Sequence, residues 1–508
     1  MKKTINLPVS IEEKDALILA QQEEIERLNA RYRQVLEQFK LAQLRKYARS
    51  SESNVLQLEL QFDEADSVPT EELPKEENNT ITVTYTRNKP KRRALPDNLP
   101  REVIEHDVPE HEKQCACGCL KQRIAEEVTE QLEVVPAQLK VIQHVRPKYA
   151  CNRCDEGVVI SPMPTLFLPK SMAAPSLVAY TIISKYQDHL PLYRQEKIWQ
   201  RMGIEIARNT VCGWIMAAAE VCMPMRNALM TSLIASGYIQ ADETPLQVMD
   251  EPNRKNTSLS YMWLYRSAIP DKPVVLFDYR ETRQARWPKE ILCNFRGHLQ
   301  TDGYKGYDWV DRESDIIHLG CMAHARRPFA EIVKLAKKTV GKSHQAVAYF
   351  QKLYAIEKIA REGQFTHEQR YQLRMEKAMP ILEEMKDWLD QSLRHAVPQS
   401  KLNDALVYMH DRWIELTNYL TDGSLEIDNN GAENQIRPFA LGRKNWLIAG
   451  SPRGAHASAL FYSLIATAVA NGWNPFDYLC YLFENIRTCK TDDDYSNLLP
   501  FNIISKTN

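Results

Sequence analysis

Three acidic residues stand where strand-like or helix-like segments end or begin. Asp242 follows the strand-like run GYIQA, Asp302 ends a later run in QTDGYKGY, and Glu433 lies in DNNGAENQIRP, where a helix is predicted to begin. In-line cleavage or joining of a phosphodiester uses two divalent cations about 4 Å apart, held by shared carboxylates. Because Mg²⁺ keeps several of its waters, a few carboxylates can hold it. The three residues therefore permit a metal-dependent phosphoryl-transfer site.

Each carboxylate also has a structural explanation. Asp242 could cap a turn, and Asp302 could open an Asp-Gly turn. Glu433 has capping-box spacing from Asn430 and ion-pair spacing to Arg437. Taken one at a time, the residues leave both roles open.

A cysteine cluster supplies a second candidate metal site. A close group of cysteines precedes the β-like run VIQHVRPKYAC, and the pair Cys-Asn-Arg-Cys ends that region. Tetrahedral zinc takes four thiolates or imidazoles, and two such groups are typical of a zinc ribbon. We expect a structural Zn²⁺ held by four of five cysteines: Cys115, Cys117, Cys119, Cys151 and Cys154. The first group is compressed, so His106 or His111 could complete the site, and reduced cysteines without metal are the alternative.

Length and composition limit the class of protein. The 508 residues suggest about three domains, and 44% hydrophobic residues allow large cores. The net charge of −1 means that binding to nucleic acid must come from local basic patches. Neither a secretion signal nor an apolar run of about 18 residues is visible, so we expect no membrane span and a cytoplasmic protein.

Residues 1–55 are predicted to form a coiled-coil helix. Apolar residues recur every seven positions at Ile11, Ile18, Ile25, Tyr32 and Phe39. Such a heptad pattern favours self-association, and an amphipathic helix packed on its own chain is the alternative. We expect a homodimer through this helix.

Residues 56–104 form an acidic and then basic run with few large apolar groups, which predicts a disordered linker. The basic run could touch DNA phosphates or simply be solvated. Residues 105–168 hold the zinc-ribbon-like module.

Residues 169–235 are predicted to be helical, with a helix-turn-helix pattern. One helix is expected over Leu192–Met202, followed by a turn at Gly203 and a second helix near Ala207. At the start of that second helix, side chains could meet base edges; the candidates are Arg208, Asn209 and Thr210. A structural helical hairpin is the alternative.

Residues 236–450 are predicted to form a layered α/β catalytic domain. Four strand-like runs, GYIQADETPLQVM, YMWLYRSA, PVVLFDY and GHLQTDGY, precede a fifth in DIIHLG. A helical insertion of about 325–422 separates the second and third carboxylates. Residues 451–508 are predicted to form a C-terminal helical cap.

The ordered motifs of this chain resemble those of transposases of the bacterial insertion sequence 66 group. The resemblance rests on KYARSSE, the cysteine region, DHLPLYRQEKIWQRMGIEIARNTVCGWI, ADETPLQV, TDGYKGY, AHARRPF, NNGAENQIRPFALGRKNWLIAGSPRGA and SLIATAVANGWNPFDYL. Together these motifs cover about 450 residues. The compressed first cysteine group departs from the pattern and leaves the zinc ligands open.

The resemblance implies a ribonuclease-H-like catalytic fold of the type with three acidic residues. Asp242, Asp302 and Glu433 match the catalytic positions and would hold two Mg²⁺ or Mn²⁺ ions. It implies cleavage and strand transfer on double-stranded DNA, namely the terminal inverted repeats and a target, with small accessory proteins of the element as candidate partners. The alternatives are a nuclease of the same fold and a catalytically silent DNA-binding regulator.

Basic residues near these motifs are candidates for gripping phosphates, and surface solvation is their ordinary alternative. They are Arg326, Arg327, Arg437, Arg443 and Lys444. His324 could orient a phosphate or move a proton, or it could be a packed structural histidine.

Overall fold

The computed structural model describes residues 21–22, 27–28, 31–32, 139–149, 159–269, 271–335 and 341–503. The chain divides into two compact units, one of residues 69–164 and one containing the rest. The described residues of the predicted coiled coil are helical and exposed, and the remainder of that segment lies outside the described residues. The five cysteines of the predicted zinc site, the charged linker and the dimer contact also lie outside them.

The smaller unit contains one described pair of short strands. β1 (Lys148–Tyr149) pairs antiparallel with β2 (Val159–Ile160). β1 falls at the end of the β-like run that was predicted to separate the two cysteine groups.

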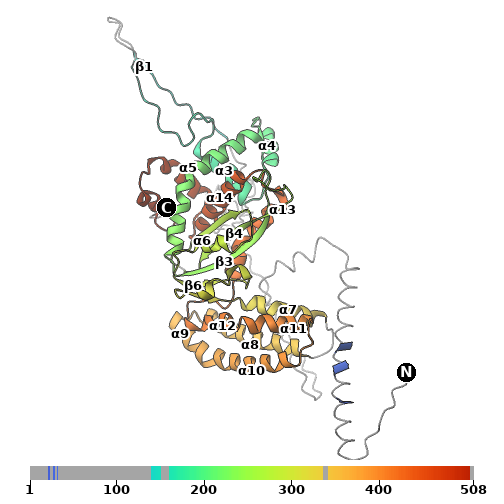
Figure 1. Cartoon of the computed structure of the whole chain (residues 1–508). Helices are drawn as coiled ribbons and strands as arrows, with labels where there is room; N and C mark the ends of the chain where they lie inside the picture. The colour runs from blue at the N-terminus through green and yellow to red at the C-terminus, as the bar shows by residue number, and fades with distance from the viewer. Residues whose placement is uncertain are drawn as a thin grey trace, which may run out of the picture. The chain divides into compact units, whose positions relative to one another are not determined.

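The larger unit contains a five-stranded mixed sheet with the order β5-β4-β3-β6-β7 (Figure 1). Its strands are β3 (Tyr238–Gln247), β4 (Leu259–Ser267), β5 (Val275–Arg280), β6 (Gly297–Gln300) and β7 (Ile316–Leu319). β3, β4 and β5 form an antiparallel meander, whereas β6 runs parallel to both β3 and β7. All five strands predicted from the alternating patterns are therefore present, and the protein is a mixed α+β structure.

Short elements connect these strands. They are α6 (Arg286–Ile291), η2 (Lys305–Tyr307) and η3 (Val310–Arg312). α6 carries the chain from β5 to β6, and the two 3₁₀ turns carry it from β6 to β7.

The edge strand β5 is covered by the helix α14 (Pro452–Ala470). The backbone N–H of Val275 donates to the hydroxyl of Thr467 over 3.0 Å, and that of Phe277 donates to Ser463 over 2.8 Å. Unpaired backbone groups at a sheet edge are open to unwanted strand pairing. Two hydroxyl side chains of α14 thus accept hydrogen bonds from backbone N–H groups at this edge. The predicted C-terminal cap is helical in this part.

Helices pack around this sheet in one apolar core. They are α3 (Pro175–Tyr186), α4 (Leu192–Arg201), α5 (Arg208–Ile234), α13 (Asn430–Trp446), α14, α15 (Pro475–Asn485), η6 (Ile486–Thr488) and α16 (Asp492–Asn497). The two helices and the intervening turn predicted from the sequence are present, and Gly203 has a φ of 82° in that turn between α4 and α5. Among the described residues, we find no helix with the length and apolar character that a membrane span requires.

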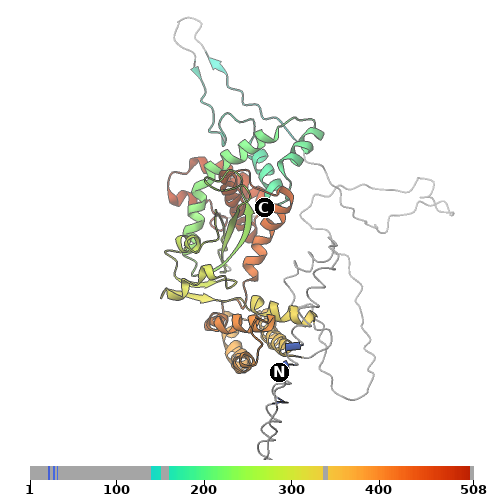
Figure 2. The ribbon, with the colours of Figure 1, turned by 45° about the vertical axis from the view of Figure 1, so that its right-hand side comes forward.

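A second apolar core lies in a helical block between β7 and α13. Its elements are α7 (Met322–Leu335), α8 (Lys342–Glu362), α9 (His367–Leu373), the π-helical turn η4 (Arg374–Ala378), α10 (Met379–Arg394), α11 (Lys401–Asp411), α12 (Trp413–Thr417) and η5 (Asn418–Thr421). Figures 1 and 2 show this block beside the β6 end of the sheet. The helical stretch predicted between the second and third carboxylates is therefore present.

Arg374 is a fully buried cation inside the helical block. Its guanidinium donates to both carboxylate oxygens of Glu357 over 2.8 and 2.9 Å. Its remaining N–H groups donate to the backbone carbonyls of Tyr419, Asp422 and Leu425. Since a guanidinium has five donors, every donor is used. Arg374 thereby fixes the segment through which the chain returns towards α13.

Replacing Arg374 with alanine should lower the free energy of unfolding by about 3–5 kcal/mol, because it leaves three carbonyls and a buried carboxylate without their partner. Lys358→Ala is the control, since Lys358 and Glu362 form a surface pair with a 3.9 Å separation. That pair should contribute about 0.5 kcal/mol or less. Urea unfolding followed by circular dichroism measures both changes. Equal effects of the two substitutions would contradict the role given to Arg374.

Candidate active site

The parallel pairing of β3 with β6 brings the two predicted aspartates to the same level of the sheet. Gln240 pairs with Gln300 in the strand register. Asp242 follows two residues after this pair within β3, and Asp302 follows two residues after it just past the end of β6, so the register carries both to the same end of these strands. Glu433 lies in the first turn of α13, which packs on β3.

The three carboxylates interact electrostatically. Burial raises the pKa of Asp242 well above its ordinary value, and the nearby carboxylates of Glu243, Asp302 and Glu433 raise it further. Burial also raises the pKa of Glu433 to about 7, with Asp428 and Asp302 adding to the shift and Arg327 opposing it. Negative charge is therefore concentrated in a partly buried place, where a cation would relieve it.

A buried glutamine network fixes the strands below the aspartates. The amide of Gln240 donates to the side-chain oxygen of Gln300 over 2.7 Å, and the hydroxyl of Tyr238 donates to the same oxygen over 2.6 Å. Gln300 in turn donates to the carbonyls of Gly320 and Glu426 over 3.1 and 2.9 Å. The network joins β3, β6 and the segment before α13, so it sets the relative positions of the strands and helix that carry the carboxylates.

The start of α13 is held directly against β3. Asn429 donates its side-chain N–H to the carbonyl of Ala241 over 2.9 Å, beside Asp242. A Cβ atom on Gly431 would lie 1.8 Å from Arg266 and 2.4 Å from Gln240. A larger residue here, two positions before Glu433, would therefore have to displace the ends of the Arg266 and Gln240 side chains.

The turn after Asp302 has similar demands. Tyr304 donates its backbone N–H to the Asp302 carboxylate over 2.9 Å, and Tyr408 donates its hydroxyl to the Asp302 carbonyl over 2.7 Å. Gly303 has a φ of 87°, and a Cβ there would meet the Tyr408 hydroxyl at 2.4 Å. Tyr408 lies on α11, so the helical block helps to hold the second aspartate.

Glu433 faces the first turns of α7. Its Oε1 lies 3.4 Å from Nδ1 of His324, and its Oε2 lies 3.8 Å from Arg327. The histidine geometry is not that of a hydrogen bond, so both Oε1 and Nδ1 are buried without a hydrogen-bond partner among the described residues. Buried polar atoms are normally satisfied. An orphaned carboxylate oxygen beside two aspartates fits a site for a hard cation.

Cys321 and His324 extend this cluster. Their ligand atoms and a Glu433 oxygen all lie within 4.8 Å of one another. Burial and Arg327 lower the pKa of His324 to about 4, so its imidazole is neutral at pH 7. His324 therefore stands uncharged beside Glu433.

Glu243 is a further carboxylate at the edge of the site. Arg283 donates to Oε1 of Glu243 over 2.6 Å, and the Glu243 side chain is 1% exposed. Burial and Asp302 raise the pKa of Glu243 to about 7, against the opposing charge of Arg283. Because Glu243 already has a cationic partner, we regard it as a supporting residue.

The basic residues predicted to bind DNA differ in their exposure. Arg327 and Lys444 are exposed, Arg437 and Arg443 are half-buried, and Arg326 is buried. Arg327 and Arg437 both lie close enough to lower the pKa of Glu433. These two residues therefore surround the third carboxylate, whereas Arg326 presents little surface.

The residues proposed for base contacts lie at the start of α5. Arg208, Asn209 and Thr210 are all exposed in its first turn. They are not brought together with the three carboxylates by any described contact.

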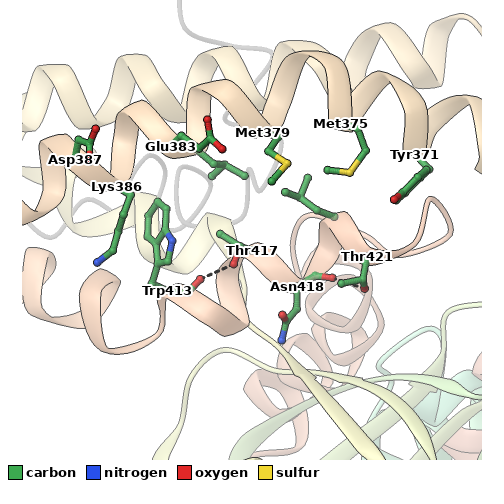
Figure 3. A pocket seen from close by; sticks show the side chains of 12 residues that line it. Tyr371, Met375, Met379, Glu383, Lys386, Asp387, Trp413, Thr417, Asn418 and Thr421 are labelled. Carbon is green, nitrogen blue, oxygen red and sulfur yellow. Dashed lines mark hydrogen bonds between the residues drawn. The ribbon is translucent and has the colours of Figure 1, made fainter.

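A pocket lies elsewhere, inside the helical block (Figure 3). It has a volume of about 770 Å³ and is lined by side chains such as Met375, Met379 and Trp413. None of the described residues that line it is one of the residues predicted for chemistry. The candidate site is therefore defined by its carboxylates and not by this pocket.

The sequence reasoning missed Gln240, Gln300, Asn429 and Glu243. One signal was present, because Gln-x-Asp occurs twice, at 240–242 and 300–302. A glutamine on the same face as each aspartate is the pattern expected of paired, half-polar strands.

Four family models match successive parts of the chain. The model described as "Transposase IS66 family" matches residues 170–457, and the "IS66 C-terminal element" matches residues 463–501. The "zinc-finger binding domain of transposase IS66" matches residues 112–155, which supports a structural zinc. The family's leucine-zipper model, described as "Transposase C of IS166 homeodomain", matches residues 34–104.

Similar proteins occur in Sinorhizobium fredii (strain NBRC 101917 / NGR234). The uncharacterized protein y4jD is 33% identical over 421 residues, covering 80% of this chain and 81% of the relative. The uncharacterized protein y4qI is 32% identical over 434 residues, covering 82% and 79%. The uncharacterized protein y4hP is 29% identical over 459 residues, covering 85% and 81%. The resemblance seen in the sequence is confirmed, and this chain belongs to the IS66 family of transposases.

Proposed function

We propose that this protein cleaves DNA at transposon ends and joins those ends to target DNA. Asp242, Asp302 and Glu433 would hold two Mg²⁺ or Mn²⁺ ions. The observation that carries the proposal is the electrostatic coupling of the three carboxylates: Asp302 and Glu433 both raise the pKa of Asp242, and Asp302 also raises the pKa of Glu433. Carboxylates that repel one another in a buried site indicate a place where cations bind.

We further propose that the sheet is the core of a ribonuclease-H-like fold. Its three antiparallel strands followed by two parallel strands support this assignment. The helical block between β7 and α13 then acts as an insertion that separates Asp302 from Glu433 in sequence.

When bound, the two cations would activate the attacking oxygen and stabilise the leaving oxygen of an in-line displacement. In the first reaction, water adds to the phosphorus at the transposon end, the bond to the 3′ oxygen breaks, and a 3′-hydroxyl and a 5′-phosphate remain. In the second, that hydroxyl attacks a target phosphate, forms a new phosphodiester and displaces the target's own 3′-hydroxyl. Neither reaction requires a covalent intermediate with the protein.

The chain's own residues would position the two DNA strands. Arg327 and Arg437 lie beside Glu433 and would bind phosphates near the cleaved bond. Neutral His324 would hold Glu433 or accept a hydrogen bond from DNA or water. Further phosphate contacts would come from half-buried Arg443 and exposed Lys444, whereas Arg326 is buried.

Recognition of the terminal repeats would use other parts of the chain. We propose base contacts by Arg208, Asn209 and Thr210, which are exposed at the start of α5. The zinc would be held by four of Cys115, Cys117, Cys119, Cys151 and Cys154. A dimer formed by the N-terminal helix would pair two DNA ends in the cytoplasm, and small accessory proteins of the element are possible partners.

Asp242→Asn should leave binding to terminal DNA unchanged and reduce cleavage and joining by more than about 100-fold, because one shared carboxylate charge is lost. A strand-transfer assay with a pre-cut end duplex, supercoiled target and Mg²⁺ measures joined product. Asp250→Asn is the matched control, because Asp250 is exposed in the loop after β3.

Joined product from the wild type is the expected result of this assay. Cutting without joining would favour a nuclease of the same fold. Binding without either reaction would favour a silent regulator, and full activity of the Asp242 variant would refute the site assignment.

Glu433→Gln should stabilise the ion-free protein at pH 8 by about 1–3 kcal/mol. The pKa of Glu433 is raised from 4.5 to about 7, so the folded state holds a proton that the unfolded state releases between these values. Stability therefore falls as the pH rises from about 4.5 to 7 and stays reduced above it. The gain from the substitution should vanish below pH 4.5.

Thermal unfolding across this pH range, with and without Mg²⁺, measures the effect. Mg²⁺ should raise the Tm of the wild type at pH 8 and not that of the Glu433 variant. Glu362→Gln, a change in an exposed surface pair, should behave like the wild type. A destabilised Glu433 variant at pH 8 would contradict the proposed repulsion.

A further inference from the structure

Leu447 sits at the centre of a strained turn just after α13. Its φ is 65° and its ψ is −56°, and Ile448 donates its backbone N–H to the carbonyl of Trp446 over 2.8 Å. These values describe a γ-turn of the rare, positive-φ type. A positive φ is a genuine outlier for a bulky side chain, and such strain concentrates at functional sites.

The turn is held rigidly on both sides. Leu447 donates its backbone N–H to Arg443 in the last turn of α13 over 2.7 Å. Ala449 donates to the carbonyl of Gln247 over 3.0 Å and accepts from Met249 over 2.9 Å, so it forms a bridge beside Val248 at the end of β3. Two firm elements therefore force an unfavourable conformation on the residue between them.

The strain has no packing explanation, because the side chain at its centre points into solvent. Leu447 is 68% exposed and Ile448 is 39% exposed. A residue that only filled a core would be buried. A strained backbone that displays leucine to solvent is instead suited to contact something outside the chain.

The surroundings of this apolar tip are basic. Lys444 is exposed one helical turn before Leu447. Arg453 follows six residues after Leu447 with a side chain that is 64% exposed and paired with the exposed Glu220. Arg194 on α4 contacts Asn445 over 3.5 Å, which joins the tip to the helix-turn-helix pair. Positive charge around a small apolar wedge complements a nucleic acid duplex.

The tip also lies at a defined distance from the carboxylates. Fourteen residues of α13 separate Glu433 from Leu447, which corresponds to about 21 Å at the helical rise. Six residues of β3 separate Asp242 from Val248, which corresponds to about 20 Å along a strand. At about 3.4 Å per base pair, both paths span about six base pairs.

We propose that Leu447 is an apolar wedge that enters the base stack of the bound end duplex about six base pairs from the cleaved phosphate. Lys444 would bind a flanking phosphate, and Arg453 would bind another by exchanging its partner Glu220 for DNA. The inference rests on the proposed function, because it requires DNA held at the carboxylate site. Partial unstacking would bend the duplex and expose its end to the site.

The test uses 2-aminopurine, whose fluorescence rises when it is unstacked. A duplex from the DNA that flanks this coding sequence is labelled at each position from the second to the tenth base pair from the cleavage point. With the full-length wild type, the signal should peak about six base pairs from that point. Leu447→Ala should abolish the peak and weaken duplex binding by about 10-fold.

Two further variants distinguish insertion of Leu447 into the base stack from a purely structural role of this residue. Leu447→Gly also loses the peak, yet it should raise the Tm above that of Leu447→Ala, because glycine adopts the positive φ without strain. Leu447→Met should keep the peak. Ile414→Ala removes another exposed apolar side chain, 72% exposed on α12, and should change neither signal nor binding.

The outcomes distinguish this inference from the proposed function. A wild type that cuts and joins the duplex without a fluorescence peak, or a peak that survives Leu447→Ala, overturns the wedge alone. A change of oligomeric state in Leu447→Ala, with unchanged DNA binding, would assign the tip to a protein contact and also overturn it. A wild type that neither binds nor cuts the duplex overturns both.

Discussion

Mutual repulsion among buried carboxylates is the constraint on which the rest of this structure depends. Asp242 and Glu433 are partly or fully buried near Asp302, and their pKa values rise as a result. Folding gains nothing from such a cluster without a cation, because burial and like charge both disfavour ionisation. The surrounding structure must therefore hold the three groups together against their own electrostatics. That requirement explains why so many polar contacts converge beneath and beside the site.

Three separate anchors meet this requirement. The hydrogen bond between Gln240 and Gln300 ties the two aspartate strands together, and Asn429 ties the start of α13 to β3. The third anchor lies away from the carboxylates. Buried Arg374 donates hydrogen bonds to backbone carbonyls of the segment that precedes α13 and so fixes that segment. The helical block is thus more than a spacer between the second and third carboxylates. It supplies Tyr408, which contacts Asp302, and His324, which lies beside Glu433.

The sequence predicted the strands, the helical block and the helix-turn-helix pair because each has a strong local pattern. Period-two alternation marked β3 to β7, and Gly203 marked the turn between α4 and α5. The glutamine network was not predicted, because hydrogen bonds between residues sixty apart leave no local period. The strained conformation of Leu447 was also invisible, since it is imposed by a bridge to β3. The zinc ligands stay a prediction, supported by the family's zinc-finger model.

The most direct test of the account is the anomalous scattering of Mn²⁺ in crystals of the full-length protein with end DNA. We expect two manganese peaks about 4 Å apart, with Asp242 contacting both ions and with Asp302 and Glu433 each contacting one. Peaks that avoid these residues, or a bound DNA phosphate far from all three, would contradict it.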